Sequence, residues 1–447
     1  MKLTSWLNHT VKTGIFCLAV NAAFSQTTTL KFEEAQTLAR ANYPIIKQKE
    51  LISQTAALNI SNISKGYLPQ LNINGQATYQ SDVTSINVPI PNIKIDAPGK
   101  DQYKIYAEAS QLIYDGGQIK AQKEIQEYTR RADDQQLEVE LYKVRQRIST
   151  LHLSILYLNE QLKQIDLIRA DILTGIKRTE AQVNNGIAFR SNLNVLKAEL
   201  LKTDQREDEI AGSREGLINT LSVFVNRPLN DSIILETPGN VNSGDSTQNI
   251  NKSNLRGAIS NQFSDEEINR PELKQFADRS ALLGLQQNLI KARNKPKTNL
   301  FIQGGYGRPA LNLLKNQFEF YYIGGIRLTW NLGGLYTSGK EKQLVGISQR
   351  NLDVQQETFL LNTKAELATQ RAEISKLAKM IATDSEIITL RNQVRDASKA
   401  QLDNGVITAS DYVREINAAD QAVQAKITHE IQLLQAKINY QNISGKY

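Results

Sequence analysis

The sequence contains two copies of one pattern, each about 200 residues long, far beyond the period of solenoid repeats. Three landmarks of the first copy return 227 residues later, namely a proline that opens a helical stretch, a second proline and a tyrosine. The pairs are Pro44 and Pro271, Pro69 and Pro296, and Tyr79 and Tyr306. A second motif, AQVNNGI at 181–187, returns as AQLDNGV at 400–406, with Ser191 matched by Ser410. The sequence therefore predicts a duplicated domain.

Composition narrows the class of protein. Long stretches are rich in Gln, Ala, Leu, Lys and Glu, which is typical of long exposed helices. After the N-terminus no window offers 18 uncharged apolar residues, which excludes a polytopic helical membrane protein. The net charge of +7 is dispersed along the chain, so we expect no nucleic-acid partner.

The N-terminus, residues 1–25, is predicted to be a secretory signal peptide. Lys2 and Lys12 flank a short apolar run that begins at Gly14, and small residues precede the expected cleavage after Ser25. Cys17 is the single cysteine, so the mature chain would have none and could form no disulfide. Lipidation of Cys17 is the second alternative, since the residues before it lack the small side chains that such a site requires.

Four segments are predicted to be β-strands, two within about 70–114 and two within about 298–331. Apolar and polar residues alternate without a break over 71–80, and the apolar face of the fourth segment runs from Phe318 to Trp330. Alternation alone also fits a soluble sandwich, but the export signal and the aromatic strand ends favour a membrane β-barrel. Four strands cannot enclose a lumen, whereas three chains give twelve strands. The expected membrane-interface aromatics are Tyr79, Tyr103, Tyr114, Tyr306, Phe318, Tyr322 and Trp330.

The longest segments are predicted to be coiled-coil helices. From Leu137 to Ile165 apolar residues recur at alternating steps of four and three, and Leu360 begins a strict seven-residue series in the second copy. No proline interrupts 116–184, which predicts a helix roughly 100 Å long. Asn-Gly pairs then favour a left-handed stop and a return helix. Ser191 and Ser410 suit helix caps or turn positions just beyond.

The predicted organisation is mainly α with a small β part. The first structural repeat, 26–237, contains a helix, two strands and a long helical hairpin over about 116–225. A polar linker, 238–262, joins it to the second repeat, 263–447, whose hairpin covers about 334–445. Long antiparallel hairpins would form a coiled-coil α-barrel, and four strands per chain would complete a trimeric 12-stranded transmembrane β-barrel.

Taken in order, several motifs resemble the TolC-like outer membrane efflux protein family over nearly the whole mature chain. They are the opening LKFEEA at 30–35, RPEL at 270–273, the strand-to-helix junctions LIYDGG at 112–117 and LTWNLGG at 328–334, and the two Asn-Gly turns. The resemblance implies a homotrimer in the outer membrane with helices projecting into the periplasm. It also implies an exit duct of a tripartite efflux or secretion system, filled by an inner-membrane pump and a periplasmic adaptor (membrane fusion) protein.

The resemblance further assigns roles to individual residues. The adaptor would dock at the helical tips, which are Asn185, Gly186, Ser191, Asn404, Gly405 and Ser410. Aspartates after the second tip narrow the periplasmic entrance in the family, and Asp411 matches the first of them. Arg414 stands one turn later, where a second aspartate is expected. Because opposite charges one turn apart form a pair, the pore constriction at Asp411 and Arg414 would be locally neutralised. Asp411 also suits a helix N-terminus, where a negative charge is favoured.

The sequence predicts no enzyme, cofactor or metal site. A lone His152 on a heptad helix is best interpreted as structural, and no Cys/His cluster has metal-binding spacing. The run from Gly334 to Lys340 mimics a phosphate loop, but Glu341 occupies the position of the magnesium-binding hydroxyl. The alternative to a channel is a periplasmic structural or adaptor coiled-coil protein without a pore. That alternative explains the heptads but leaves the four alternating strands without a role.

Overall fold

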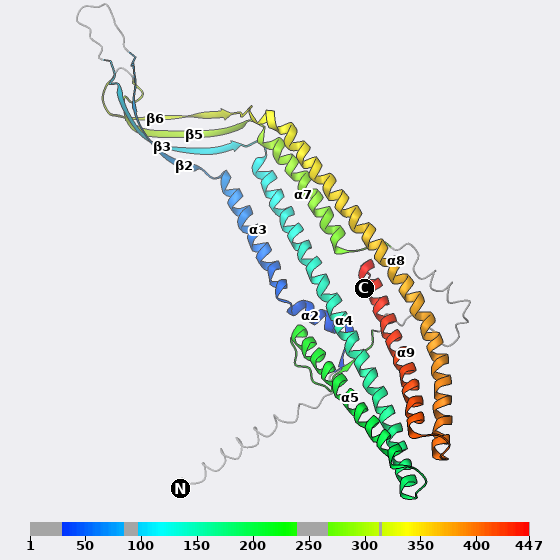
Figure 1. Ribbon diagram of the computed structural model, residues 1–447. Helices are drawn as coiled ribbons and strands as arrows, with labels where there is room; N and C mark the ends of the chain where they lie inside the picture. Colours follow the sequence, from blue (N-terminus) through cyan, green and yellow to red (C-terminus); the bar gives the residue numbers. More distant parts are fainter. Residues whose placement is uncertain (1–28, 85–96, 239–266, 313–314, 447) are drawn as a thin grey trace, which may run out of the picture. The chain divides into compact units, whose positions relative to one another are not determined.

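The computed structural model describes residues 29–84, 97–238, 267–312 and 315–446 (Figure 1). The chain divides into two compact units, and each takes segments from both halves of the sequence. The first unit is drawn from Met1–Ile46, Glu140–Arg270 and Asn362–Tyr447, and the second from Lys47–Val139 and Pro271–Leu361. The predicted signal peptide and residues 239–262 of the predicted linker lie outside the described residues.

Two pairs of long helices account for most of the described chain. Helix α4 (Gln118–Asn184) has 67 residues and α8 (Gly334–Asp403) has 70, so each is roughly 100 Å long at 1.5 Å per residue. Each is followed after a short turn by a 36-residue helix, α5 (Arg190–Val225) or α9 (Ala409–Ser444). Shorter helices precede the strands, namely α2 (Phe32–Asn42), α3 (Gln48–Ser64) and α7 (Pro271–Arg293).

The second unit contains an antiparallel sheet with the strand order β2-β3-β5-β6 (Figure 1). The strands are β2 (Gln70–Tyr79), β3 (Asp101–Tyr114), β5 (Lys297–Arg308) and β6 (Glu319–Thr329). Strands β3 and β5, which belong to different halves of the sequence, pair at the centre of the sheet. The register is regular except for one bulge between Leu112 and Tyr114.

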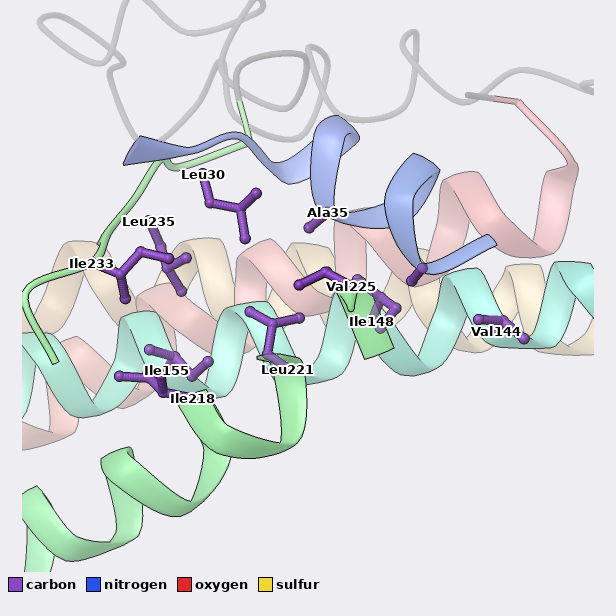
Figure 2. Packing of buried hydrophobic residues seen from close by; sticks show 11 residues of the cluster. Leu30, Ala35, Val144, Ile148, Ile155, Ile218, Leu221, Val225, Ile233 and Leu235 are labelled. Atoms are coloured by element: carbon purple, nitrogen blue, oxygen red, sulfur yellow. The ribbon is translucent and has the colours of Figure 1, made fainter. Parts of the chain in front are cut away.

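The main core of the first unit lies where α2 packs on the long helices (Figure 2). Heptad positions of α4 supply Ile148 and Ile155, which are fully buried against Ile218 and Leu221 of α5. Leu30 covers these side chains from strand β1 (Thr29–Leu30), which pairs in parallel with β4 (Ile234–Leu235). The apolar seam read from the sequence is thus the surface that holds the first unit together.

The predicted fold class is confirmed, because the chain is mainly helical, with antiparallel hairpins and one small sheet of four long strands. The observed strands lie within the predicted segments, and β6 ends one residue inside each of the aromatics Phe318 and Trp330. The opening helix of the first copy differs from expectation, since a 3-10 turn (Pro44–Lys47) divides it into α2 and α3. Pro44 opens this turn, where it needs no backbone N–H donor.

His152 lies in the core of the first unit. Its ring is fully buried, makes an edge contact with Phe32 at 5.3 Å between ring centroids, and has Nε2 2.9 Å from the Glu236 carbonyl oxygen. The carbonyl must accept a proton from Nε2, so Nδ1 is the unprotonated nitrogen, and it has no hydrogen-bond partner among the described residues. Burial lowers the pKa of His152 below its ordinary value, although the Glu236 carbonyl and Glu33 oppose this shift.

We expect the first unit to lose stability on acidification. Below pH 6.5 the unfolded chain binds a proton at His152 that the folded chain excludes, so the free energy of unfolding falls with pH, by at most about 1.4 kcal/mol per pH unit. Thermal unfolding of the helical circular dichroism signal at pH 7.5 and 5.5 measures this slope. His152→Gln, which keeps a donor but cannot titrate, should reduce it. An unchanged slope in that variant would contradict the assignment.

Candidate functional site

One face of the four-stranded sheet is apolar along all four strands. The register places Ile73, Ala107, Gly304 and Tyr322 in one row across the sheet, and Gly75, Ile105, Tyr306 and Phe320 in the next. Large side chains of this face lie open, with exposed fractions of 75% for Ile73, 87% for Phe320 and 74% for Ile326. An apolar surface of this extent is a site of contact with lipid or protein.

The opposite face is mostly polar. It carries Asn72, Asn74 and Gln76 on β2 and Gln303 on β5. Glu108 on β3 and Arg327 on β6 form an ion pair across this face, with Nη1 2.8 Å from Oε1. Since side chains alternate along each strand, the sheet separates a wet face from a dry face.

The predicted interface aromatics fall mainly into two groups at opposite ends of the strands. Tyr79, Tyr103, Tyr306 and Phe318 lie near the ends that lead away from the helices, and the Tyr306 and Phe318 rings stack at 5.5 Å. Tyr114 and Trp330 lie at the ends that lead into α4 and α8, and Trp330 Nε1 donates to the Asn294 carbonyl at 3.0 Å. Tyr322 departs from this arrangement, because it stands opposite Gly304 in the middle of the strand.

The sheet has two edges. Strands β2 and β6 are each paired on one side, and within the described residues the sheet does not close on itself. Free backbone donors and acceptors along a strand are available to another strand.

The turns after α4 and α8 share one backbone geometry. Gly186 and Gly405 have φ values of 72° and 71°, in the left-handed region that favours glycine. Each glycine N–H donates to a carbonyl three residues earlier, and the N–H of the next residue, Ile187 or Val406, donates to the carbonyl five residues earlier. This pair of bonds is the Schellman motif, which satisfies the last carbonyls of a helix. Ile187, Phe189 and Val406 stand out at these turns, with exposed fractions of 70%, 81% and 70%.

The expectation that Ser191 and Ser410 cap the return helices is wrong. The N-cap of α5 is Phe189, which makes no side-chain cap bond, and that of α9 is Thr408. Both serines lie one residue inside the helix, where the backbone is already helical. Thr408 holds the cap because its hydroxyl accepts from the Asp411 N–H at 3.2 Å while the Asp411 carboxylate accepts from the Thr408 N–H.

Asp411 is thus part of a capping box. Its carboxylate accepts bonds from the Thr408 hydroxyl at 2.7 Å and from the Thr408 N–H at 3.2 Å, and these bonds lower the pKa of Asp411, with Arg414 adding to the effect. Arg414 Nη2 lies 3.5 Å from Asp411 Oδ1. The expected ion pair is therefore present. The carboxylate stays ionised well below neutral pH, and its charge is partly neutralised within the same helix.

Near these turns, ion pairs join α4 to α8. Asp171 of α4 lies 3.5 Å from Arg395 and 3.7 Å from Lys399 of α8. Arg178 of α4 also forms an ion pair with Asp403, the last residue of α8. These partners lie more than 200 residues apart, and no sequence pattern singled them out.

Tyr412 lies in the apolar cluster below these ion pairs. It is fully buried with Ile172, Leu196 and Ile416, and its hydroxyl has no hydrogen-bond partner among the described residues. Burial, followed by the nearby Asp171, raises the pKa of Tyr412 to about 12. The tyrosine is therefore neutral and fixes the start of α9 against α4 and α5.

The described residues contain no group of three or more His, Cys, Asp or Glu side chains able to hold a metal ion. Among the described helices, none combines the length and the apolar character needed to cross a membrane. The segment from Gly334 to Lys340 is the first part of α8 and follows an antiparallel strand, so it lacks the setting of a phosphate-binding loop.

Comparison with known proteins agrees with this geometry. Residues 36–222 match the family model described as outer membrane efflux protein. The chain is a member of this outer membrane efflux protein family. It is therefore an outer-membrane channel protein and not an enzyme. No curated protein matches the chain.

Solved outer-membrane channels share the fold of this family member at low sequence identity. The Campylobacter jejuni CmeC outer membrane channel is 13% identical, with 93% of this chain and 85% of that chain covered and a TM-score of 0.60. The open state of the Neisseria gonorrhoeae MtrE outer membrane channel is 14% identical, with coverages of 93% and 89% and a TM-score of 0.61. The outer membrane protein VceC of Vibrio cholerae is 13% identical, with coverages of 93% and 96% and a TM-score of 0.59.

The two faces of the sheet predict opposite responses to one substitution. Ile302→Lys places a charge on the apolar face and should prevent stable membrane insertion, since a lysine facing lipid near the bilayer midplane costs about 2–4 kcal/mol. Gln303→Lys, one residue further on, faces the polar side and should insert normally. Recovery in the outer-membrane fraction measures both. Equal insertion of the two variants would contradict a lipid-facing role for the apolar face.

Proposed function

We propose that this protein is the outer-membrane exit duct of a tripartite efflux or secretion system, a passive gated channel spanning the outer membrane and the periplasm. The observation that carries the proposal is the open sheet, which has one apolar face, one polar face and two unpaired edges. A bilayer offers no water to satisfy edge strands, so a sheet of this kind is stable in lipid only as part of a closed barrel.

Three copies of the chain supply such a barrel. The β6 edge of one copy would pair with the β2 edge of the next, and the four strands of each copy would give twelve. An even number of antiparallel strands closes without an edge, and twelve leave room for a lumen lined by the polar face. Cyclic symmetry makes the three edge pairings identical. The aromatic groups at the two ends of the strands suit the two membrane interfaces.

The helical hairpins would extend into the periplasm as a tunnel, with the Asn185–Gly186 and Asn404–Gly405 turns at its tips. A periplasmic adaptor would dock there and connect the duct to an inner-membrane pump. Ile187, Phe189 and Val406 support this role, because exposed apolar side chains on a rigid turn provide area for a partner at little entropic cost. Nothing in the chain selects a cargo, so selection of the exported substrate is assigned to the pump.

The gate would be a two-state contact between the hairpins. Asp171 and Arg178 hold α4 to α8 near the tips in the resting state, and adaptor binding would favour an arrangement in which these pairs are broken. Asp411 and Arg414 would stand at the constriction as a neutralised pair. A periplasmic coiled-coil protein without a pore is the alternative, but it would give the two-faced sheet no purpose.

Conductance of the purified protein in a planar bilayer tests the duct and its gate together. Asp171→Ala removes two ion pairs between α4 and α8 and should raise the frequency and size of openings, because the resting contact is weakened. Asp396→Ala is the matched control. Asp396 pairs with Arg395 within the same helix, so its loss leaves Asp171 paired.

Wild-type protein should give a small, mostly closed conductance, and the control should match it. Membrane-inserted trimers that never conduct, in the wild type and in Asp171→Ala alike, would refute the channel. A conductance that is equally small in both would retain the channel and remove Asp171 from its gate.

Variants of the two tip glycines test docking. Gly186→Val with Gly405→Val forces a β-branched residue into left-handed backbone, so the Schellman turns should open and export should be lost. Gly212→Val with Gly346→Val is the control, since both glycines lie inside helices with open space beside them. Export is measured in cells that produce equal amounts of heat-modifiable trimer. Normal export from the tip variant would refute docking at these turns.

A further inference from the structure

The ion pair on the polar face of the sheet is held in a fixed geometry. Arg327 Nη1 and Nη2 donate to Glu108 Oε1 and Oε2 at 2.8 Å and 3.1 Å, a two-pronged contact that fixes both side chains. Strand β5 lies between the two partners, and its Phe301 ring supports the guanidinium at 4.3 Å. Gly325 leaves room for this ring, because a Cβ there would stand 3.4 Å from Phe301.

The pair has a defined place along the strands. Glu108 is opposite Asn72, and Arg327 lies two residues before the end of β6, so both are near the ends that lead into the helices. Toward the other end, the polar face carries Lys104 and Glu319, both opposite Gly307. Each part of the polar face thus has one positive and one negative side chain. The Glu108 side chain is 15% exposed and that of Arg327 is 46% exposed.

We propose that the Glu108–Arg327 pair sets the ion selectivity of the barrel lumen. This inference rests on the proposed function, in which three sheets close with their polar faces inward. A ring of like charges on a pore wall attracts the opposite ion and repels its own kind. With both partners present the three pairs cancel, and the lumen discriminates weakly between anions and cations. Loss of either partner leaves a ring of three like charges, so the two losses have opposite effects.

The test is the reversal potential of single channels in a KCl gradient, recorded in the wild-type background and with Asp171→Ala to reduce the influence of the helical gate. Glu108→Gln should raise the ratio of chloride to potassium permeability several-fold. Arg327→Gln should lower it several-fold. The double variant Glu108→Gln, Arg327→Gln should return to the wild-type ratio, which separates charge from a loss of structure. Heat-modifiable trimer confirms that each variant is folded.

The possible results are distinct. Opposite shifts that cancel in the double variant support the inference. Conducting channels in which both single variants keep the wild-type ratio, or shift it in the same direction, overturn the inference and leave the channel in place. Inserted trimers that conduct in no background refute the proposed function and the inference with it.

Discussion

The structure depends on backbone hydrogen bonding at the edges of its sheet. A four-stranded sheet whose outer strands are paired on one side only has donors and acceptors that a bilayer cannot satisfy, and each such group costs several kcal/mol when buried in hydrocarbon. The apolar face adds a second requirement, since side chains such as Phe320 are almost fully exposed on one chain. Both requirements are met together if copies of the chain pair edge to edge in a membrane. The proposed trimer is the smallest assembly that also leaves a lumen.

The helical unit has its own source of stability. Heptad positions along α4, among them Ile148 and Ile155, are buried against α5 and α2, so the hairpin is held by side-chain packing without help from the sheet. The Schellman turns then end α4 and α8 at one residue each and expose apolar side chains beyond it. Strong packing along the hairpins and exposed tips are compatible, because the tips need only a rigid turn.

Much of the fold follows from the sequence, because its signals are periodic. Alternation over 71–80 marked β2, and steps of three and four from Leu137 marked the buried face of α4. The candidate site was less accessible. Thr408 caps α9 in place of Ser410, a choice between neighbouring hydroxyls that depends on backbone geometry. The links from Asp171 to Arg395 and from Glu108 to Arg327 join residues more than 200 positions apart, and no local pattern encodes such a contact. The comparison between Asp411 and Arg414 succeeded because the two lie one helical turn apart.

The strength of the links between α4 and α8 suits a gate that a partner can open. Each chain has three such ion pairs, made by Asp171 with Arg395 and Lys399 and by Arg178 with Asp403. Partly exposed pairs contribute about 0.2–1 kcal/mol each, which gives roughly 2–9 kcal/mol for the proposed trimer. A change from almost always closed to almost always open needs about 5.5 kcal/mol of differential binding. The resting contact is thus strong enough to keep the duct shut and weak enough for an adaptor to reverse. Buried Tyr412 adds packing without charge, so the hairpins stay folded when these pairs break.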